Sequence, residues 1–143
     1  MKTIFAPIKL ALLFIIAFHV SASAEIVVQT LTKETAKKLG ITMHFKEGKD
    51  SVKVWLDFKE EGALKNFSHA ELRMKDAKGN FLLSAMLKPH PVYHGQLDDL
   101  VTVAFTAKKE QLAHCSFMVV AYAALGGEGY TLKVSDFLDA KKD

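Results

Sequence analysis

Strict alternation of apolar and polar side chains is the feature that most limits the fold of this chain. In the segment SVKVWLDFK (51–59), every second residue from Val52 to Phe58 is apolar, whereas Trp55 shares the other parity with lysine and aspartate. Residues two apart lie on the same face of an extended strand. The pattern therefore predicts a β-strand with one face in a core and Trp55 on the other face.

Further segments show the same alternation or form short apolar runs between turn residues. The turn DAKGN (76–80) should join two of them into a hairpin, because glycine and asparagine tolerate positive φ angles. We expect strands at 26–31, 51–59, 69–75, 81–87, 100–107, 115–123 and 130–134, with the glycine-rich segment LGGEGY (125–130) as the turn before the last of them. Several short strands separated by turns predict an antiparallel β-sandwich.

One short helix is expected before the surest strand. The segment TKETAKKLG has Thr32 as a favourable N-cap and Gly40 at its end. On this helix Leu31, Thr35 and Leu39 would face the core. The alternative to the sandwich is an α+β fold, in which a curled antiparallel sheet packs on this N-terminal helix.

The segment GEGYTLKV (127–134) resembles a glycine- and tyrosine-containing pattern near a late strand of many immunoglobulin-like domains. In those domains the tyrosine hydroxyl often ties a corner of the sandwich, which would be the role of Tyr130. The Cys…Trp…Cys pattern of the family is missing. The resemblance implies an immunoglobulin-like sandwich and carries no function with it.

The first 24 residues have the features of a secretory signal peptide. Lys2 and Lys9 flank a start that leads into the apolar run 10–18, and the small residues 22–24 follow. The run is shorter than the roughly 20 residues that a membrane-spanning helix needs. We expect cleavage before Glu25, export to the periplasm or beyond, and no stable membrane insertion afterwards; the alternative is an uncleaved anchor.

The remaining chain predicts a single β-rich domain at 25–138 and a short charged tail at 139–143. Loss of the leader lowers the formal net charge from +3 to +1, and this balance gives no indication of nucleic-acid binding. Cys115 is the only cysteine, so no internal disulfide is available.

Two of the predicted strands are apolar on both faces. In 81–87 only Ser84 is polar, and in 117–122 both parities are apolar. Such strands are either central strands covered by the N-terminal segment or the helix, or they form a subunit interface. A homodimer is therefore one possible arrangement.

The stretch KPHPVYHGQLDD (88–99) is the first candidate site. His90 and His94 with Asp98, or with Asp99 in its place, are suitable ligands for zinc or copper, although Pro91 excludes the helical zinc motif. The alternative is an ordinary loop. Whether His44, His69 or His114 joins such a site depends on the fold.

A second candidate is a ligand or partner surface around Trp55, which would be favoured if Tyr93 or Tyr122 lay beside it. The neighbours His114 and Cys115 should point to opposite faces of a strand, so Cys115 is expected to be a buried apolar residue. No catalytic motif is present.

These observations lead to three hypotheses. The first is an exported, non-enzymatic binding or protein-interaction module with an unknown protein or small ligand as its partner. The second is a periplasmic zinc- or copper-binding protein that uses the loop histidines. The third is an enzyme with scattered catalytic groups, which would require a deep pocket with a perturbed titratable group.

Overall fold

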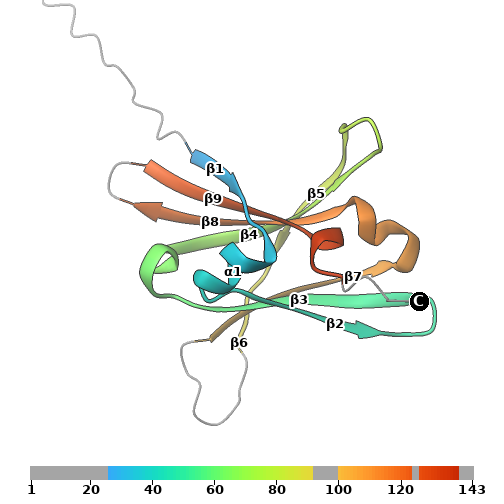
Figure 1. The fold of residues 1–143 in the computed structure, drawn as a ribbon, viewed down its shortest axis with the longest axis horizontal. Coiled ribbons are helices and arrows are strands. Elements are labelled where there is room, and N and C mark those ends of the chain that lie inside the picture. The colour runs from blue at the N-terminus through green and yellow to red at the C-terminus, as the bar shows by residue number, and fades with distance from the viewer. Residues whose placement is uncertain (1–25, 92–99, 124–125, 139–143) are drawn as a thin grey trace, which may run out of the picture.

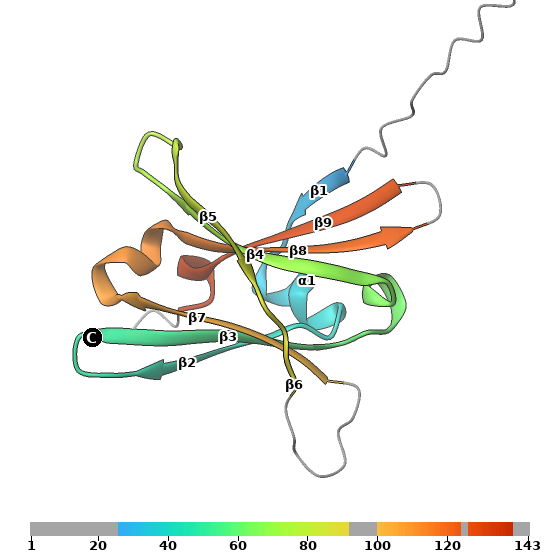
Figure 2. The same ribbon diagram turned by 180° about the vertical axis from the view of Figure 1, so that it is seen from behind.

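Two β-sheets face each other in the computed structural model, which describes residues 26–91, 100–123 and 126–138 (Figures 1 and 2). The five-stranded sheet has the order β1-β9-β8-β4-β5, and the four-stranded sheet has the order β2-β3-β7-β6. The strands are β1 (Ile26–Thr30), β2 (Thr42–Glu47), β3 (Ser51–Lys59), β4 (Phe67–Lys75), β5 (Phe81–Leu87), β6 (His90–Pro91), β7 (Leu100–Lys108), β8 (Cys115–Ala123) and β9 (Gly126–Lys133). The helical elements are α1 (Lys33–Lys38) and three 3₁₀ turns, Gly62–Leu64, Lys109–His114 and Val134–Asp136.

The expectation of a mainly β, sandwich-like fold is confirmed. Neighbouring strands pair antiparallel throughout, except that β1 runs parallel to β9. A single sheet curled around the helix, the alternative from the sequence, is not the arrangement found.

The core lies between the two sheets. Phe105 of β7 contacts Phe117 of β8 with 4.9 Å between ring centroids, and Phe58 of β3 contacts Phe67 of β4 at 5.0 Å. Each contact joins one sheet to the other. Because burial of one such side chain contributes about 1.5–3 kcal/mol, these rings stabilise the stacking of the sheets.

Helix α1 begins and ends where the sequence predicts. The Thr32 hydroxyl accepts a hydrogen bond from the Thr35 backbone N–H, and the Thr35 hydroxyl accepts one from the Thr32 backbone N–H. Gly40 follows the helix with a φ of 73°. The expectation that Thr35 faces the core was wrong, because Thr35 is used in the cap and Ala36 is buried instead.

Three strands differ from the prediction, and one of them is the short β6, which lies in the stretch 88–99 that was considered as a loop. β2 was not expected, although Met43 and Phe45 pack against the core from it. β9 begins at Gly126 rather than at Tyr130, so the glycine-rich segment expected as a turn is partly strand. Neighbouring side chains approach two of these glycines closely, since a Cβ atom would lie 3.1 Å from Tyr122 Cδ1 at Gly127 and 2.3 Å from Met118 Cε at Gly129.

The two apolar strands have different environments. β8 is covered, since Met118 and Val120 are 2% and 1% exposed, and Ile26 of β1 lies over the same face. β1 joins this sheet beside β9 and forms no layer over β8, so the expected cover by the N-terminal segment stays a prediction. β5 was expected to be central, but it is the edge strand of its sheet, and its apolar side chains are exposed.

Candidate functional site

The outer face of the four-stranded sheet carries a stacked pair of aromatic rings. Trp55 alternates with the buried residues Val54 and Leu56 on β3, so its side chain lies on the face away from the core, as predicted. His44 of β2 is its cross-strand partner. The two rings are 5.0 Å apart between centroids and are tilted by only 15°.

A polar chain runs across three strands beside this pair. His44 Nε2 lies 3.1 Å from Asp57 Oδ2, and the Thr102 hydroxyl donates a hydrogen bond of 2.5 Å to Asp57 Oδ1. Both oxygens of the carboxylate are therefore held by protein groups. Thr102 is only 8% exposed, so the orientation of Asp57 is fixed from its buried side.

A recess of about 300 Å³ opens next to this chain. Its walls come from the end of α1, from β2 and β3, and from the start of β7. The lining residues are Leu39, Gly40, Thr42, His44, Asp57, Lys59, Glu61 and Leu100. The lining combines two carboxylates, one lysine and one imidazole with the apolar side chains of Leu39 and Leu100, and the Asp57 carboxylate is fixed at its wall.

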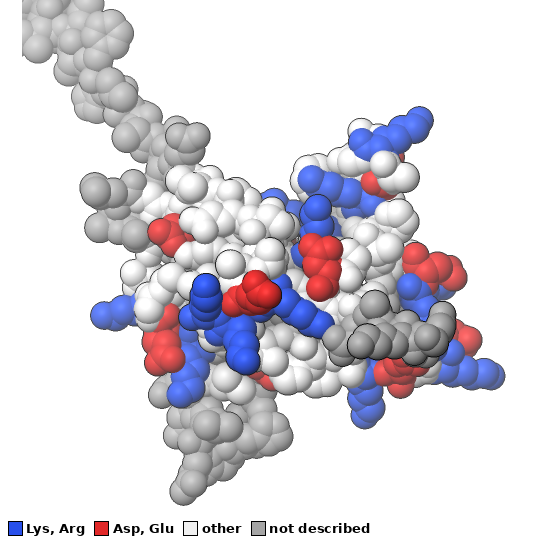
Figure 3. All heavy atoms as spheres, in the orientation of Figure 1, with Lys and Arg blue, Asp and Glu red and all other residues white. Residues whose placement is uncertain are grey.

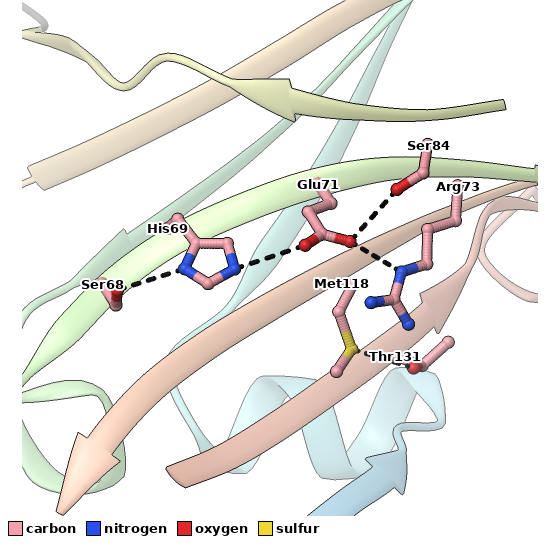
Figure 4. Close-up of polar contacts among 7 residues, drawn as sticks. All are labelled: Ser68, His69, Glu71, Arg73, Ser84, Met118 and Thr131. Atoms are coloured by element: carbon pink, nitrogen blue, oxygen red, sulfur yellow. Dashed lines mark hydrogen bonds and ion pairs between the residues drawn. The ribbon is translucent and has the colours of Figure 1, made fainter. Parts of the chain in front are cut away.

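A second polar cluster lies on the outer face of the other sheet (Figure 4). His69, Glu71 and Arg73 share one parity of β4, opposite to that of the buried Ala70 and Leu72. Glu71 Oε1 is 3.3 Å from His69 Nε2, and Glu71 Oε2 accepts a 2.8 Å hydrogen bond from Arg73 Nε.

Ser84 of β5 donates to the same Glu71 oxygen at 3.3 Å. Burial raises the pKa of Glu71, but the hydrogen bond and charge of Arg73, with smaller contributions from His69 and Ser84, outweigh it and leave the pKa below 4.5. Each oxygen of Glu71 has a protein partner, as each oxygen of Asp57 has, but His69, Glu71 and Arg73 do not line the recess described above.

The residues predicted for the metal site lie mostly outside the described part of the chain. His94, Asp98 and Tyr93 are in the segment 92–99, which is not described. The backbone of His90 is described, and in β6 it pairs opposite Thr102, the residue that donates to Asp57. Among the described residues, no group of three or more His, Cys, Asp or Glu side chains could hold a metal ion.

Trp55 and Tyr122 do not lie together. Tyr122 is on β8 in the five-stranded sheet, where it is 45% exposed and lies beside Gly127. Trp55 is on the outer face of the opposite sheet. Tyr122 therefore does not lie beside Trp55, and these two residues do not form the shared aromatic surface that would favour a ligand or partner site.

Cys115 and Tyr130 are both buried, and each donates a hydrogen bond within the fold. Cys115 is 2% exposed, its thiol donates to the Gln111 carbonyl, and burial raises its pKa. Tyr130 is 3% exposed, and burial together with Glu128 raises its pKa to about 12. Its hydroxyl donates to Glu128, two residues earlier on the same strand, and so it does not tie a corner in the way the family resemblance implied.

Reasoning from the sequence missed the partners of Trp55. Asp57 could be placed on the correct face of its strand by parity, but His44 could not, because β2 was not predicted. Nothing in the sequence distinguished Thr102 from the other residues of its strand. A recess formed where three strands and a helix end meet depends on contacts between residues distant in sequence, which alternation does not encode.

No family model matches the chain, and no curated protein matches it either. In the part of the chain that the structure describes, no helix is long and apolar enough to cross a membrane. The candidate function therefore depends on the geometry of the site alone.

Proposed function

We propose that this protein is an exported, non-enzymatic interaction module that binds its partner at the recess beside His44 and Asp57. The observation that carries the proposal is the fixed Asp57 carboxylate at the wall of an open recess, next to the stacked Trp55 and His44 rings. Preorganised groups of this kind bind without the cost of ordering flexible side chains.

The size of the recess favours a protein partner. A volume of about 300 Å³ is at the lower end of the range for small-molecule pockets, and it suits a single inserted side chain. Asp57 and Glu61 outnumber Lys59 among the charged lining residues. We therefore propose that the inserted group is a cationic side chain, with arginine preferred because it can also stack on aromatic rings.

The groups with clearly shifted pKa values lie outside the recess, and none of them has the shift typical of a catalytic group. Where the structure resolves a clear shift, the pKa values of Glu71 and Asp76 are lowered, and those of Cys115 and Tyr130 are raised. The lowered pKa values make the two carboxylates weaker bases. The raised pKa values keep the thiol and the phenol protonated. Catalytic groups are usually shifted in the opposite direction.

Charged side chains of both signs are interspersed over the face seen in Figure 3. A single basic surface, as expected for a nucleic-acid-binding protein, is not evident on that face. This distribution supports a protein partner over nucleic acid.

Trp55 provides the readout for a direct test, because it is the only tryptophan in the chain. N-acetyl-arginine amide, a single guanidinium probe, should change the tryptophan fluorescence in a saturable way with an affinity on the order of millimolar. N-acetyl-citrulline amide has nearly the same shape without the charge and should have little effect.

Asp57→Asn should weaken the response to the arginine probe about tenfold, since a charge-assisted hydrogen bond is lost. The variant should still fold, because the asparagine oxygen can accept from Thr102. Asp136→Asn, which removes an exposed carboxylate elsewhere, is the matched control. Equal responses to both probes, or an unchanged response in Asp57→Asn, would contradict the proposed site.

A zinc or copper site is the second candidate, favoured by the pairing of His90 with Thr102 next to Asp57. Under this proposal His90, His94 and Asp98 bind the metal. Native mass spectrometry of the mature chain, purified without chelator or affinity histidines, should then show a metal adduct that is lost in the double variant His90→Ala/His94→Ala. A metal-free mass that does not change when zinc or copper is added would argue against it.

We also propose export by cleavage after residue 24 and membership of the immunoglobulin-like class. The first proposal predicts a periplasmic protein that begins near Glu25, which intact mass measurement tests. The second is supported by strand order, because the first strand joins the last in parallel and the other pairs are antiparallel.

A further inference from the structure

The edge strand β5 exposes an unusual amount of apolar surface. Phe81, Leu82, Leu83 and Met86 are 59%, 63%, 44% and 68% exposed. β4 pairs with one side of β5, and no described strand pairs with the other. The β4–β5 hairpin extends beyond the rest of the molecule in both ribbon views (Figures 1 and 2).

β5 has few of the features that normally prevent edge strands from pairing, and its one irregularity lies near its start. Every second residue of such a strand directs its N–H and C=O groups away from its sheet. Proteins usually protect such an edge with charged residues, proline or a bulge on the edge strand. The sequence FLLSAML contains neither a charge nor a proline. A bulge is present only near the start of the strand, where Met74 pairs with Leu83 and Lys75 with Phe81, so that Leu82 has no partner on β4.

We propose that β5 pairs antiparallel with β5 of a second copy, about a two-fold axis at Ser84, so that the two five-stranded sheets become continuous. This register places Leu82 opposite the partner's Met86, and Leu83 opposite the partner's Ala85. Both contacts are apolar, and the strand is self-complementary, as a two-fold interface requires.

The charges next to β5 are compatible with this register. Beside the axis, Glu71 of β4 is paired with Arg73 and with Ser84, so the middle of the interface carries no unpaired charge. Towards each end, Asn80 would face the partner's Lys88. The Asp76 carboxylate is held next to Asn80, because it accepts hydrogen bonds of 2.8 and 2.9 Å from the backbone and side chain of Asn80. Its negative charge would therefore lie near the positive charge of that lysine.

The expected affinity is moderate. Seven paired residues with these side chains would bury on the order of 500 Å² per copy, below the roughly 800 Å² per partner of a standard interface. We therefore expect a dissociation constant in the micromolar range rather than the nanomolar range. This inference does not depend on the proposed ligand site, which is on the other sheet.

Sedimentation velocity of the mature chain from about 1 to 300 µM should show a reversible monomer–dimer equilibrium. Two double variants test the register. Leu82→Lys/Met86→Lys places like charges opposite each other across the axis and should remain monomeric. Leu82→Glu/Met86→Lys places opposite charges there and should retain the dimer within about tenfold of the natural chain. Both variants change the same highly exposed positions, so both should fold.

Val27→Lys is the control on the other edge of the same sheet, where Val27 is 59% exposed, and it should leave the dimer unchanged. The proposal would be overturned by a natural chain that is monomeric at every concentration, which would leave this edge for a strand of another protein. It would also be overturned if the lysine pair left the dimer intact, if both double variants were monomeric, or if only Val27→Lys dissociated it.

Discussion

Gly129 shows how a single residue determines the packing of three strands. A Cβ atom at this position would lie 2.3 Å from Met118 Cε and 3.1 Å from Ile26 Cγ2. The absence of a side chain at Gly129 therefore allows the side chains of Met118 on β8 and Ile26 on β1 to lie over β9. From the sequence these glycines indicated a turn, because glycine is usually unfavourable in strands. The contacts that require Gly129 come from residues distant in sequence.

Replacement of Gly129 by alanine should lower the free energy of unfolding by about 1–3 kcal/mol, because the buried Met118 has little room to move. Urea unfolding measures the change. Gly127→Ala is the matched variant, and its loss should be smaller, since its nearest neighbour is the 45% exposed Tyr122 ring, which can turn aside. Equal losses in both variants would contradict this account.

The cap of α1 makes a separate contribution at the residue scale. Thr32→Ala removes the hydroxyl that accepts from Thr35, and it should cost about 1 kcal/mol of stability. Thr32→Ser keeps an equivalent hydroxyl and should cost much less. Thermal unfolding followed by circular dichroism distinguishes the two, and equal melting temperatures would show that the cap is not stabilising.

At the scale of elements, alternation was sufficient to predict most of the strands and the β4–β5 hairpin. It could not give the position of a strand within its sheet. β5 has the composition of a central strand and lies at an edge, because sheet order depends on pairing between distant segments. For the same reason the candidate site was only half predicted: Trp55 was placed on the correct face, whereas His44 lay on a strand that was not predicted.

The network on β4 predicts a pH dependence of stability. The pKa of Glu71 is lower in the folded chain than its ordinary value of 4.5. Its stabilising contribution is therefore present above about pH 4.5 and is lost as the pH falls through the folded-state pKa. Glu71→Gln should be less stable than the natural chain at neutral pH, and the difference should shrink in acid. A difference that stays constant with pH would contradict this assignment.

At the scale of the whole molecule, the sandwich separates two outer faces with different properties. One face has the His69–Glu71–Arg73 network and an exposed apolar edge, and the other has the stacked rings beside an open recess. The sequence predicts that two such faces exist, since alternation places polar residues outside a core. It does not predict which side chains meet on each face, because this depends on the register between strands.

We propose that the partner binds at the recess on the four-stranded sheet. A two-dimensional ¹⁵N–¹H spectrum of residues 25–143, recorded during titration with N-acetyl-arginine amide, tests this site. We predict that shift changes concentrate on β2, β3 and the start of β7, with the single indole N–H signal of Trp55 among them. Changes centred on the five-stranded sheet, or no localised changes at saturating probe, would contradict the claim.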